Sequence, residues 1–472
     1  MDVFNDIVGP AQVLTEPADM ARYLTDWTGV WSGTSRAVVR PGSTEEVAQV
    51  VRAAADLALP VTVQSGNTSI CGGSVPANGD DGILISLERM KRIRAIDTGA
   101  RTATVDAGVI LETLQDRVAE DGLDFPLVFG ARGSARIGGC LATNAGGANV
   151  LRYGNARELC LGIEAVLPDG QIINALSGLR KDNTGYDLKN LLIGSEGTLA
   201  IITGAVLRLV PTPRVRATAF LALADIEAAL PVLNRLQDDT GGLVEAFEWM
   251  PGATVEAILA HNPGMRAPLE QPADHGILVE LASTRPSDAL AGDEGEVALQ
   301  TLLLSSIEAL MEQELVVDGF FASSEQQRID LWALRESVLE TIVSHGDFVA
   351  LDASLPLSRI PEFLDRATPL TEETGLKPLL IAHLGDGNVH YAVVAGTSPW
   401  QVERVRAFTD QMIALLNDFG GSFSAEHGIG RAKVRTLARE KQPAQYRMMQ
   451  AIRKAVDPAE RLSPGLLLDA AE

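Results

Sequence analysis

The sequence contains few cysteines. Cys71, Cys140 and Cys160 are the only three among 472 residues, and no two of them form a CxxC pair. Thiols so few and so scattered exclude a disulfide framework and a cysteine-ligated iron–sulfur cluster. We therefore expect a protein of a reducing compartment, most simply the cytoplasm.

Positive charge is also scarce. The chain has 39 Lys and Arg residues against 62 Asp and Glu residues, which gives a net charge of −23. Basic clusters bind nucleic acids and anionic membrane surfaces, so neither is an expected partner. No hydrophobic run approaches the roughly 20 residues that span a bilayer, and the start, MDVFNDIVGP, lacks the pattern of a signal peptide. These absences predict a soluble globular protein.

The common phosphate-binding motifs are missing as well. No GxGxxG opens a Rossmann helix and no GxxxxGK[ST] occurs, but other glycine-rich loops do: SGNTSICGG (65–73), GARGSARIGG (130–139) and TNAGG (143–147). In such loops backbone N–H groups can converge on a phosphate, because no Cβ stands in the way. Each could instead be a tight turn between short strands. Three of them in one α/β segment favour a large phosphate-bearing ligand.

The first half of the chain has the pattern of alternating strands and helices. AVVRP (37–41) and PVTVQ (60–64) predict strands on either side of a helix over 44–59. Ser43 or Thr44 is the expected N-cap of that helix. After a short helical lead-in over residues 1–30, these elements begin an α/β region.

Later segments predict further elements and a boundary. LGIEAVLPDGQIINA (161–175) predicts a hairpin around its Pro-Asp-Gly turn. The chain length favours two or three domains, and Pro-Thr-Pro at 211–213 is a credible boundary. Beyond it we expect one long helix over 324–346, and within 287–313 an acidic, glycine-containing surface loop followed by a helix.

Five longer stretches carry a resemblance to a known family. They are SGNTSICGGSVP, IGGCLATNAGG, LRYGNARELCLGIEAVLPDG, LRKDNTGYDLKNLLIGSEGTLAIIT and AFEWM. Together they resemble the FAD-binding superfamily of vanillyl-alcohol oxidase and para-cresol methylhydroxylase, and within it the D-2-hydroxyglutarate and D-lactate dehydrogenases. The resemblance implies an α+β fold. The domains it implies are a two-subdomain FAD-binding domain (1–213), an α+β substrate or cap domain (214–424) and a C-terminal helical segment (425–472) that completes the active site.

The resemblance also implies which residues contact FAD. The first loop and the TNAGG region would hold the pyrophosphate, and GSEGT would lie along the flavin. The residues carried over are Ser65, Gly66, Asn67, Thr68, Ser69, Gly72, Gly73, Ser74, Gly138, Gly139, Thr143, Asn144, Gly147, Gly194, Glu196, Gly197 and Ile201. Some relatives attach flavin through a histidine of the first loop. No histidine occurs between residues 1 and 260, so we expect non-covalent FAD and interpret Cys71 as a small buried residue.

HLGDGNVH (383–390) brackets a turn with two of only six histidines. A type I′ turn centred on Asp386 and Gly387 would place His383 directly opposite His390, on one face of a hairpin. Two imidazoles so placed can share one metal ion, with Zn–N bonds of about 2.0–2.1 Å. The alternative is a plain hairpin whose histidines lie on a polar face.

SFSAEHGIG (422–430) adds a carboxylate, Glu426, and a further imidazole, His427. Two histidines and one carboxylate leave coordination positions open for a substrate, as in a catalytic metal site. Glu426 could instead form a salt bridge with Arg431 or Lys433. The resemblance implies that His383, His390 and Glu426 bind a divalent metal, often zinc, and that His427 is the catalytic base.

The activity implied by the resemblance is oxidation of a D-2-hydroxy acid. A metal lowers the pKa of the substrate hydroxyl, and a neutral His427 takes its proton while hydride moves from C2 to the flavin. Arg335, in LWALRESV, is the expected partner of the substrate carboxylate, because its fork matches a carboxylate bidentately. The alternative is a helix-surface arginine paired with Asp330 or Glu336.

The chain departs from the hydroxyglutarate-type pattern at several positions. Leu339, Ala350 and Ala392 stand where polar or cationic substrate contacts are expected, and Ser463 stands where relatives tend to have asparagine. An unpaired second carboxylate would be costly to desolvate in such a pocket. We therefore predict a short or moderately apolar, D-lactate-like substrate rather than hydroxyglutarate.

Other readings stay open from sequence alone. Within the superfamily these are an oxygen-using oxidase and a non-redox flavoprotein that builds ether bonds, like alkyl-dihydroxyacetone-phosphate synthase. A flavin-free metal hydrolase is a further class. The chain lacks haem-attachment and cluster cysteines, so electrons must go to an external acceptor, whether electron-transfer flavoprotein, a quinone or a cytochrome. A homodimer is possible.

Overall fold

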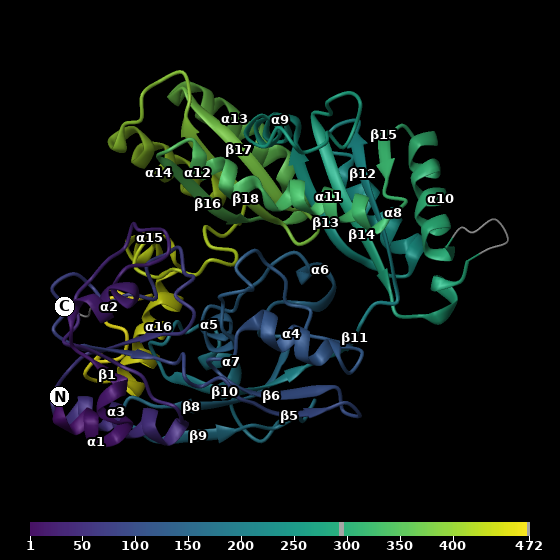
Figure 1. The fold of residues 1–472 in the computed structure, drawn as a ribbon. Coiled ribbons are helices and arrows are strands. Elements are labelled where there is room, and N and C mark those ends of the chain that lie inside the picture. The colour runs from purple at the N-terminus through teal and green to yellow at the C-terminus, as the bar shows by residue number, and fades with distance from the viewer. Residues whose placement is uncertain (292–296, 470–472) are drawn as a thin grey trace. The chain divides into compact units, whose positions relative to one another are not determined.

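The structure is a computed structural model that describes residues 1–291 and 297–469. The chain divides into two compact units (Figure 1). Unit 1 contains Met1–Gly146, Gly154–Pro211 and Glu426–Glu472, and unit 2 contains Gly147–Tyr153 and Thr212–Ala425. Within the described ranges, the helices are too short or too polar to cross a membrane.

Sheets form the framework of unit 1. One has the strand order β1-β2-β4-β3, another has the order β5-β6-β10-β8-β9, and β11 pairs with β7. The strands are β1 (Val13–Leu14), β2 (Ala37–Val39), β3 (Val61–Gln64), β4 (Ile83–Ser86), β5 (Ile93–Asp97), β6 (Thr102–Asp106), β7 (Leu123–Asp124), β8 (Cys160–Val166), β9 (Ile172–Ala175), β10 (Ile201–Arg208) and β11 (Val210–Pro211).

Helices cover these sheets and close the C-terminus of unit 1. They are α1 (Asp2–Val8), α2 (Pro17–Leu24), α3 (Thr44–Asp56), α4 (Leu111–Ala119), α5 (Ile137–Ala142), α7 (Leu188–Leu192), α15 (Val434–Glu440) and α16 (Pro443–Val456). The last segment returns to the first sheet, where Leu462 bridges Val61 of β3. Residues far apart in the sequence therefore share one core.

The strand–helix–strand pattern predicted near the N-terminus is confirmed as β2, α3 and β3. The Ser43 hydroxyl accepts the Glu46 N–H and caps α3, and two acidic residues lie in its first turn. The apolar side of α3 packs with both strands in one core. The hairpin predicted over 161–175 is also confirmed, as antiparallel β8 and β9 with Val166 opposite Ile172.

Unit 2 is built on one antiparallel sheet with the order β15-β12-β14-β13-β17-β18-β16. The strands are β12 (Val215–Leu223), β13 (Val244–Pro251), β14 (His275–Ser283), β15 (Val316–Phe321), β16 (Phe348–Ser354), β17 (Leu376–His383) and β18 (Asn388–Ala395). The inner strands are apolar on both sides, because helices cover both faces of the sheet.

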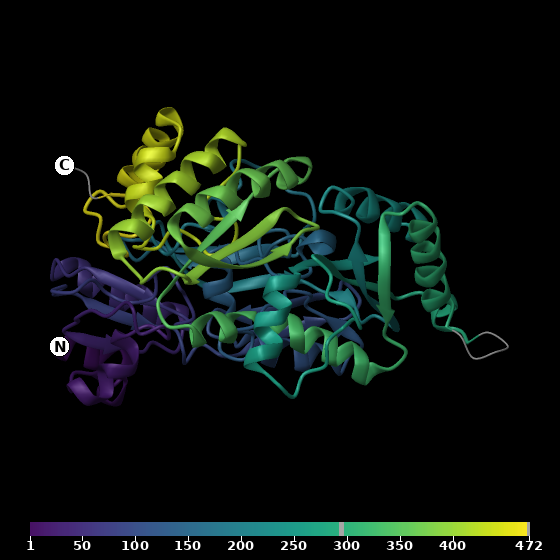
Figure 2. The same ribbon diagram turned by 90° about the horizontal axis from the view of Figure 1, so that it is seen from above.

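Two groups of helices cover the two faces (Figures 1 and 2). Face A, which carries Leu278, Leu379 and Ala392, packs against α9 (Gly252–His261), α11 (Glu325–Glu336) and α12 (Val338–Ser344). The opposite face packs against α8 (Ala229–Thr240), α10 (Ala298–Glu312), α13 (Ile360–Thr374) and α14 (Val402–Asp418). The short α6 (Val150–Tyr153) lies beside β13.

The single helix predicted over 324–346 is wrong. The segment forms α11 and α12, separated at Ser337. The Ser337 hydroxyl donates to the Ala333 carbonyl at 2.7 Å, and serine bonding of this kind bends helices. The helix predicted within 287–313 is α10, whereas the acidic loop predicted ahead of it falls on 292–296, outside the described residues.

Candidate active site

The hairpin that carries the two histidines has a longer turn than predicted. In β17 and β18, His383 pairs with Asn388 and Ile381 pairs with His390. The loop therefore spans Leu384–Gly387, and the predicted direct opposition of His383 and His390 is wrong. The chain bends where Gly387 adopts φ +86°, and the Gly387 carbonyl accepts the Leu355 N–H at 3.0 Å. This contact with a neighbouring segment stabilises the longer turn.

Despite this difference in strand register, the two histidines lie on one face of the sheet. The observed pairing differs from the predicted one by two residues, and a shift of two preserves the side on which each side chain lies. His383 and His390 are thus diagonal neighbours on face A, with ring centroids 5.4 Å apart and planes at 80°. Two imidazoles so close suit one divalent metal ion, provided that oxygen or nitrogen ligands complete the set.

A buried carboxylate that the sequence reasoning missed lies next to His383. Glu248 of β13 is fully buried on face A, opposite His383. Its Oε1 lies 2.9 Å from His383 Nδ1, and its Oε2 accepts the Arg335 Nε–H at 2.7 Å. Burial opposes ionisation, but the charges and hydrogen bonds of His383 and Arg335 outweigh it, so the pKa of Glu248 lies below its usual range. The signal for this site was an acidic residue within the apolar AFEWM.

Arg335 is the residue predicted to bind a substrate carboxylate. It projects from the last turn of α11, and its partner is Glu248 rather than Asp330 or Glu336. Its Nη2 also lies 3.2 Å from Nε2 of His383. The hydrogen bond from Nε to Glu248 therefore holds the guanidinium beside the histidine pair and sets the orientation of its other N–H groups.

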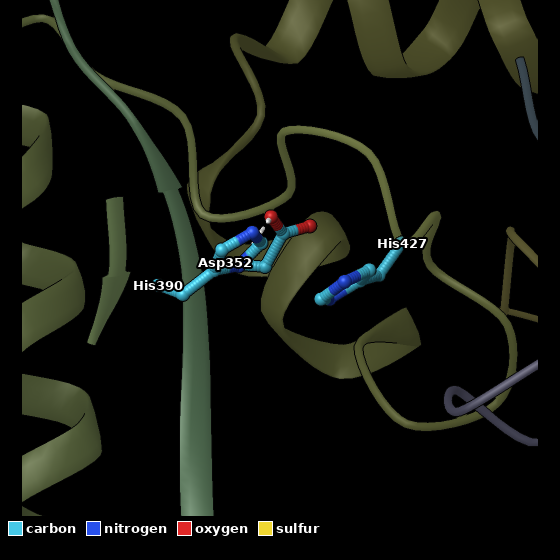
Figure 3. Close-up of side chains that lie close together, drawn as sticks. All are labelled: Asp352, His390 and His427. Atoms are coloured by element: carbon cyan, nitrogen blue, oxygen red, sulfur yellow. Dashed lines mark ion pairs between the residues drawn. The ribbon is translucent and has the colours of Figure 1, made fainter. Parts of the chain in front are cut away.

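Asp352 is a second carboxylate that the sequence reasoning missed. It lies on β16 directly opposite His390, and its Oδ1 is 3.9 Å from His390 Nδ1, the ion pair drawn dashed in Figure 3. Its Oδ2 accepts the Ala425 N–H at 3.0 Å. Carboxylates beside the ring nitrogens of metal-binding histidines commonly fix the tautomer and the orientation of those rings.

Glu426 and His427 follow directly after Ala425 and belong to unit 1. Glu426 Oε1 lies 3.4 Å from His427 Nε2, and His427 is the third residue labelled in Figure 3. The guanidinium of Arg431, a partner considered for Glu426, donates to the carbonyls of Val75 and Pro464. Histidine and carboxylate side chains of this kind can bind a metal or transfer a proton.

Glu196, predicted to contact the flavin, contacts the segment that follows His427. Its Oε1 accepts the Ile429 N–H at 2.8 Å and its Oε2 accepts the Gly430 N–H at 2.7 Å. A Cβ on Gly428 would lie 2.9 Å from Oε1. Burial raises the pKa of Glu196 although both N–H groups act against the shift. Both carboxylate oxygens are thus occupied by backbone.

The glycine-rich loops of unit 1 approach one another closely. A Cβ on Gly66 would lie 2.7 Å from Ser134 O, and a Cβ on Gly138 would lie 2.7 Å from the Ala107 Cβ. The Ser65 hydroxyl accepts the Gly139 N–H at 3.1 Å. Glycine at these positions therefore lets the loop backbones pack together, and a side chain there would collide with the neighbouring segment.

Side chains hold the first loop in shape. Ser74 Oγ donates to Asn67 Oδ1 at 2.7 Å, and Asn67, which has φ +54°, donates to the Thr25 carbonyl. Ser69 Oγ accepts the N–H groups of Cys71 and Gly73. Cys71 itself is buried, as the sequence predicted. The N-terminal lead-in also contributes, because the indole of Trp27 donates to Thr68 O.

The other predicted cofactor residues are distributed over both units. Gly194 N donates to Leu141 O and Glu196 N to Ala142 O, so the GSEGT segment lies beside the segment leading to Thr143 and Asn144. Gly197 also belongs to unit 1, and Ile201 is buried in its core. Gly147 belongs to unit 2.

Ser463, flagged as a departure from the family pattern, lies beside the GSEGT segment. A Cβ on Gly197 would come within 3.2 Å of Ser463 Oγ. This hydroxyl is buried and finds no hydrogen-bond partner among residues 1–291 and 297–469. A buried polar atom of this kind calls for a partner, which fits a polar group of a bound cofactor.

The two alanines noted as departures lie beside His390 on the sheet. Ala350 and Ala392 are directly paired across β16 and β18. Both lie on face A, one pair along from Asp352 and His390. Leu339 lies on α12 and is about half exposed, at 48%. No polar side chain is therefore provided at these three positions.

The chain matches two family descriptions along its length. Residues 35–176 match the FAD binding domain, and residues 212–467 match the C-terminal domain of FAD linked oxidases. A D-2-hydroxyglutarate dehydrogenase of Xanthomonas citri pv. viticola is 36% identical over 461 residues, covering 96% of this chain and 94% of that protein. A Schizosaccharomyces pombe protein named as a proposed mitochondrial D-lactate dehydrogenase is 33% identical, with 97% and 88% covered.

The fold is similar to that of solved flavoproteins. The substrate-bound structure of p-cresol methylhydroxylase superposes with a TM-score of 0.75 at 17% sequence identity, covering 99% of this chain and 96% of the other. At this identity the likeness concerns the fold alone, which is the α+β, FAD-binding architecture expected from the sequence.

Proposed function

The chain belongs to the FAD-linked oxidases of the vanillyl-alcohol oxidase and p-cresol methylhydroxylase type, and from this membership we propose that it is an FAD- and metal-dependent dehydrogenase of D-2-hydroxy acids. The observation that carries the proposal is the paired His383 and His390 on face A, each with a buried carboxylate beside it. In a chain of this family, such a pair provides a place to hold a 2-hydroxy acid for oxidation.

FAD would bind at the glycine-rich loops of unit 1. The close loop contacts at Gly66 and Gly138 and the buried hydroxyl of Ser463 support this assignment. The absence of histidine before residue 261 supports non-covalent attachment. When bound, FAD supplies the acceptor for the C2 hydride, and a divalent metal supplies a Lewis acid for the substrate hydroxyl and carboxylate.

The metal would be held by His383, His390 and Glu426. The donor set of two imidazoles and one carboxylate suits zinc or another divalent ion and leaves positions open for a substrate. Support comes from chain connectivity. The Ala425 N–H is hydrogen-bonded to Asp352, which lies beside His390, and the Cα of the next residue, Glu426, is about 3.8 Å from the Cα of Ala425. Glu248 and Asp352 would orient the two rings.

His427 would act as the general base. A neutral imidazole nitrogen of His427 takes the proton of the substrate hydroxyl as the C2–H bond breaks and the C2–O bond becomes a carbonyl. Arg335 would bind the substrate's C1 carboxylate through N–H groups of its fork, while Glu248 holds its Nε. With the proton passing to His427 and the hydride to FAD, the product would be a 2-oxo acid.

The substrate would be a short or moderately apolar D-2-hydroxy acid, such as D-lactate or D-2-hydroxybutyrate. Ala350 is exposed on face A next to His390 and its partner across the strands, Ala392, is buried, so the side chain of the substrate would meet an apolar surface there. D-2-Hydroxyglutarate is the second candidate, because relatives with 33–36% identity carry that name. The electron acceptor would be electron-transfer flavoprotein, a quinone or a cytochrome.

A substrate screen tests the proposal. Purified protein is assayed with D- and L-2-hydroxy acids and an artificial dye acceptor, before and after treatment with EDTA. We expect D-specific activity that is lost on chelation and restored by zinc or manganese. Full activity of the metal-free protein would refute the metal role, and a higher kcat/KM for D-2-hydroxyglutarate than for lactate would refute the substrate. Rapid reoxidation of the reduced protein by air would indicate an oxidase instead.

A further inference from the structure

The segment that carries Glu426 and His427 is anchored at both ends by carboxylates. Before it, Asp352 accepts the Ala425 N–H within unit 2 at 3.0 Å. After it, Glu196 accepts the N–H groups of Ile429 and Gly430 within unit 1 at 2.8 and 2.7 Å. Only three residues, 426–428, lie between the two anchors. So short a span leaves the backbone of Glu426 and His427 little freedom.

The Glu196 anchor is tightly built. Each carboxylate oxygen accepts one backbone N–H, so both ends of the side chain hold the segment. Glu196 has φ +52°, a left-handed conformation that a residue with a side chain adopts only at a cost in free energy. Such a conformation persists where surrounding contacts demand it, often at functional sites.

The same anchor connects the segment to both glycine-rich regions of unit 1. Glu196 lies within GSEGT, and a Cβ on Gly73 of the first loop would lie 3.8 Å from its Oε2. The Cys71 carbonyl accepts the N–H of Arg431 at 2.8 Å. The backbone after His427 is therefore held by the two loops expected to surround FAD.

We propose that Glu196 is a positioning residue: its carboxylate holds the backbone of Ile429 and Gly430 and thereby places Glu426 and His427 for metal binding and proton abstraction. The roles of Glu426 and His427 in this statement rest on the proposed function. Glu196 thus serves the metal side of the site through the backbone, rather than serving FAD through its side chain.

Two variants weaken the anchor in different ways. Glu196→Gln keeps the shape but replaces one accepting oxygen by an NH2 group, which faces an N–H donor. Gly428→Ala leaves Glu196 intact and introduces a Cβ 2.9 Å from Oε1 at φ +76°, which pushes the segment away from the carboxylate. The matched control is Glu164→Gln, because Glu164 is another buried carboxylate of unit 1 whose partners are Thr44, Thr203 and Arg94.

The first measurement concerns the anchor itself. Hydrogen exchange of the backbone amides of residues 429 and 430 is compared among the folded FAD-bound proteins. We expect at least tenfold faster exchange in Glu196→Gln and Gly428→Ala, and unchanged exchange in Glu164→Gln. Equal protection in all of them would overturn the inference. This readout needs neither metal nor substrate, so it stands even if the proposed function fails.

The second measurement concerns the consequence. Zinc affinity of the EDTA-stripped protein is measured by competition with a chromophoric chelator, together with the FAD dissociation constant and kcat and KM. We expect zinc affinity to fall about tenfold or more in both anchor variants, kcat to fall by a similar factor, and KM and FAD affinity to change less than about threefold. Loss of FAD with unchanged zinc affinity would make Glu196 a cofactor contact and refute the inference. Wild-type protein that neither binds zinc nor oxidises D-2-hydroxy acids would instead refute the proposed function.

Discussion

Replacing Glu248 tests whether the buried charges of face A form a single functional unit. Glu248 is fully buried, accepts one hydrogen bond from Arg335 and lies within hydrogen-bond distance of His383. Removing one member of a buried ion pair leaves the other charge uncompensated and costs roughly 3–5 kcal/mol. Glu248→Gln keeps the shape and one accepting oxygen, so we expect a loss near the lower end, about 3 kcal/mol.

The assay is urea-induced unfolding at neutral pH, followed by tryptophan fluorescence, with the m-value fitted for each protein. The matched control is Glu362→Gln, which breaks the surface pair between Glu362 and Arg359 at 3.2 Å, where the two side chains are 59% and 43% exposed. That change is expected to cost less than about 0.5 kcal/mol. A loss below about 1 kcal/mol in Glu248→Gln, at an unchanged m-value, would refute the reasoning.

The same variant also tests the orientation of His383. A carboxylate on the second ring nitrogen of a ligating histidine raises metal affinity, and its loss costs about ten- to a hundredfold. Zinc affinity of Glu248→Gln should therefore fall by that factor, whereas Glu362→Gln should bind zinc like the wild type. Unchanged zinc affinity in Glu248→Gln would show that His383 does not depend on this carboxylate.

Three further outcomes are expected. Gly387 has φ +86°, and in Gly387→Ala the new Cβ would collide with Leu355 O. This variant should have a free energy of unfolding in urea that is lower by about 1–2 kcal/mol or more, and it should bind zinc more weakly; unchanged stability would contradict the turn geometry. Burial opposes ionisation of Glu164, but hydrogen bonds from Arg94 and two threonines lower its pKa. The ionised side chain therefore stabilises the fold above the unfolded pKa of about 4.3, and this stabilisation is lost as the pH falls through the folded pKa. The difference in unfolding free energy between wild type and Glu164→Gln should shrink from pH 7 to pH 3, and a constant difference would contradict this expectation. Ala350→Asn places an amide on the exposed part of face A and should raise kcat/KM for D-2-hydroxyglutarate relative to D-lactate by about tenfold, with an unchanged ratio counting against the proposed position of the substrate side chain.

Local sequence patterns predicted much of the architecture. The N-cap of α3, the strands around it and the β8–β9 hairpin follow from the hydrophobic period, capping residues and turn residues within a few positions of one another. The long motifs also identified the family, because they retain order and spacing over nearly the whole chain. The break between α11 and α12 was not predicted, because a single serine bonding back to its own helix leaves the periodic pattern intact.

The histidine pair shows how far sequence reasoning reaches. The alternation of side chains in strands predicted that His383 and His390 share one face, and this holds for any turn that differs by an even number of residues. The turn itself is set by a tertiary contact, since Leu355 donates to the Gly387 carbonyl. The local sequence favoured a two-residue turn, but this tertiary contact stabilises a longer one.

The sequence by itself determined that this protein is an acidic, cysteine-poor member of an FAD-linked family with two histidines on one strand face. Only the tertiary structure decided which charges support that face. Glu248, Asp352 and Arg335 come from three distant elements, and Glu196 meets Ile429 more than 200 residues along the chain. A buried charge requires a partner, but that requirement does not say which residue supplies it, because only the folding of the chain brings such partners together.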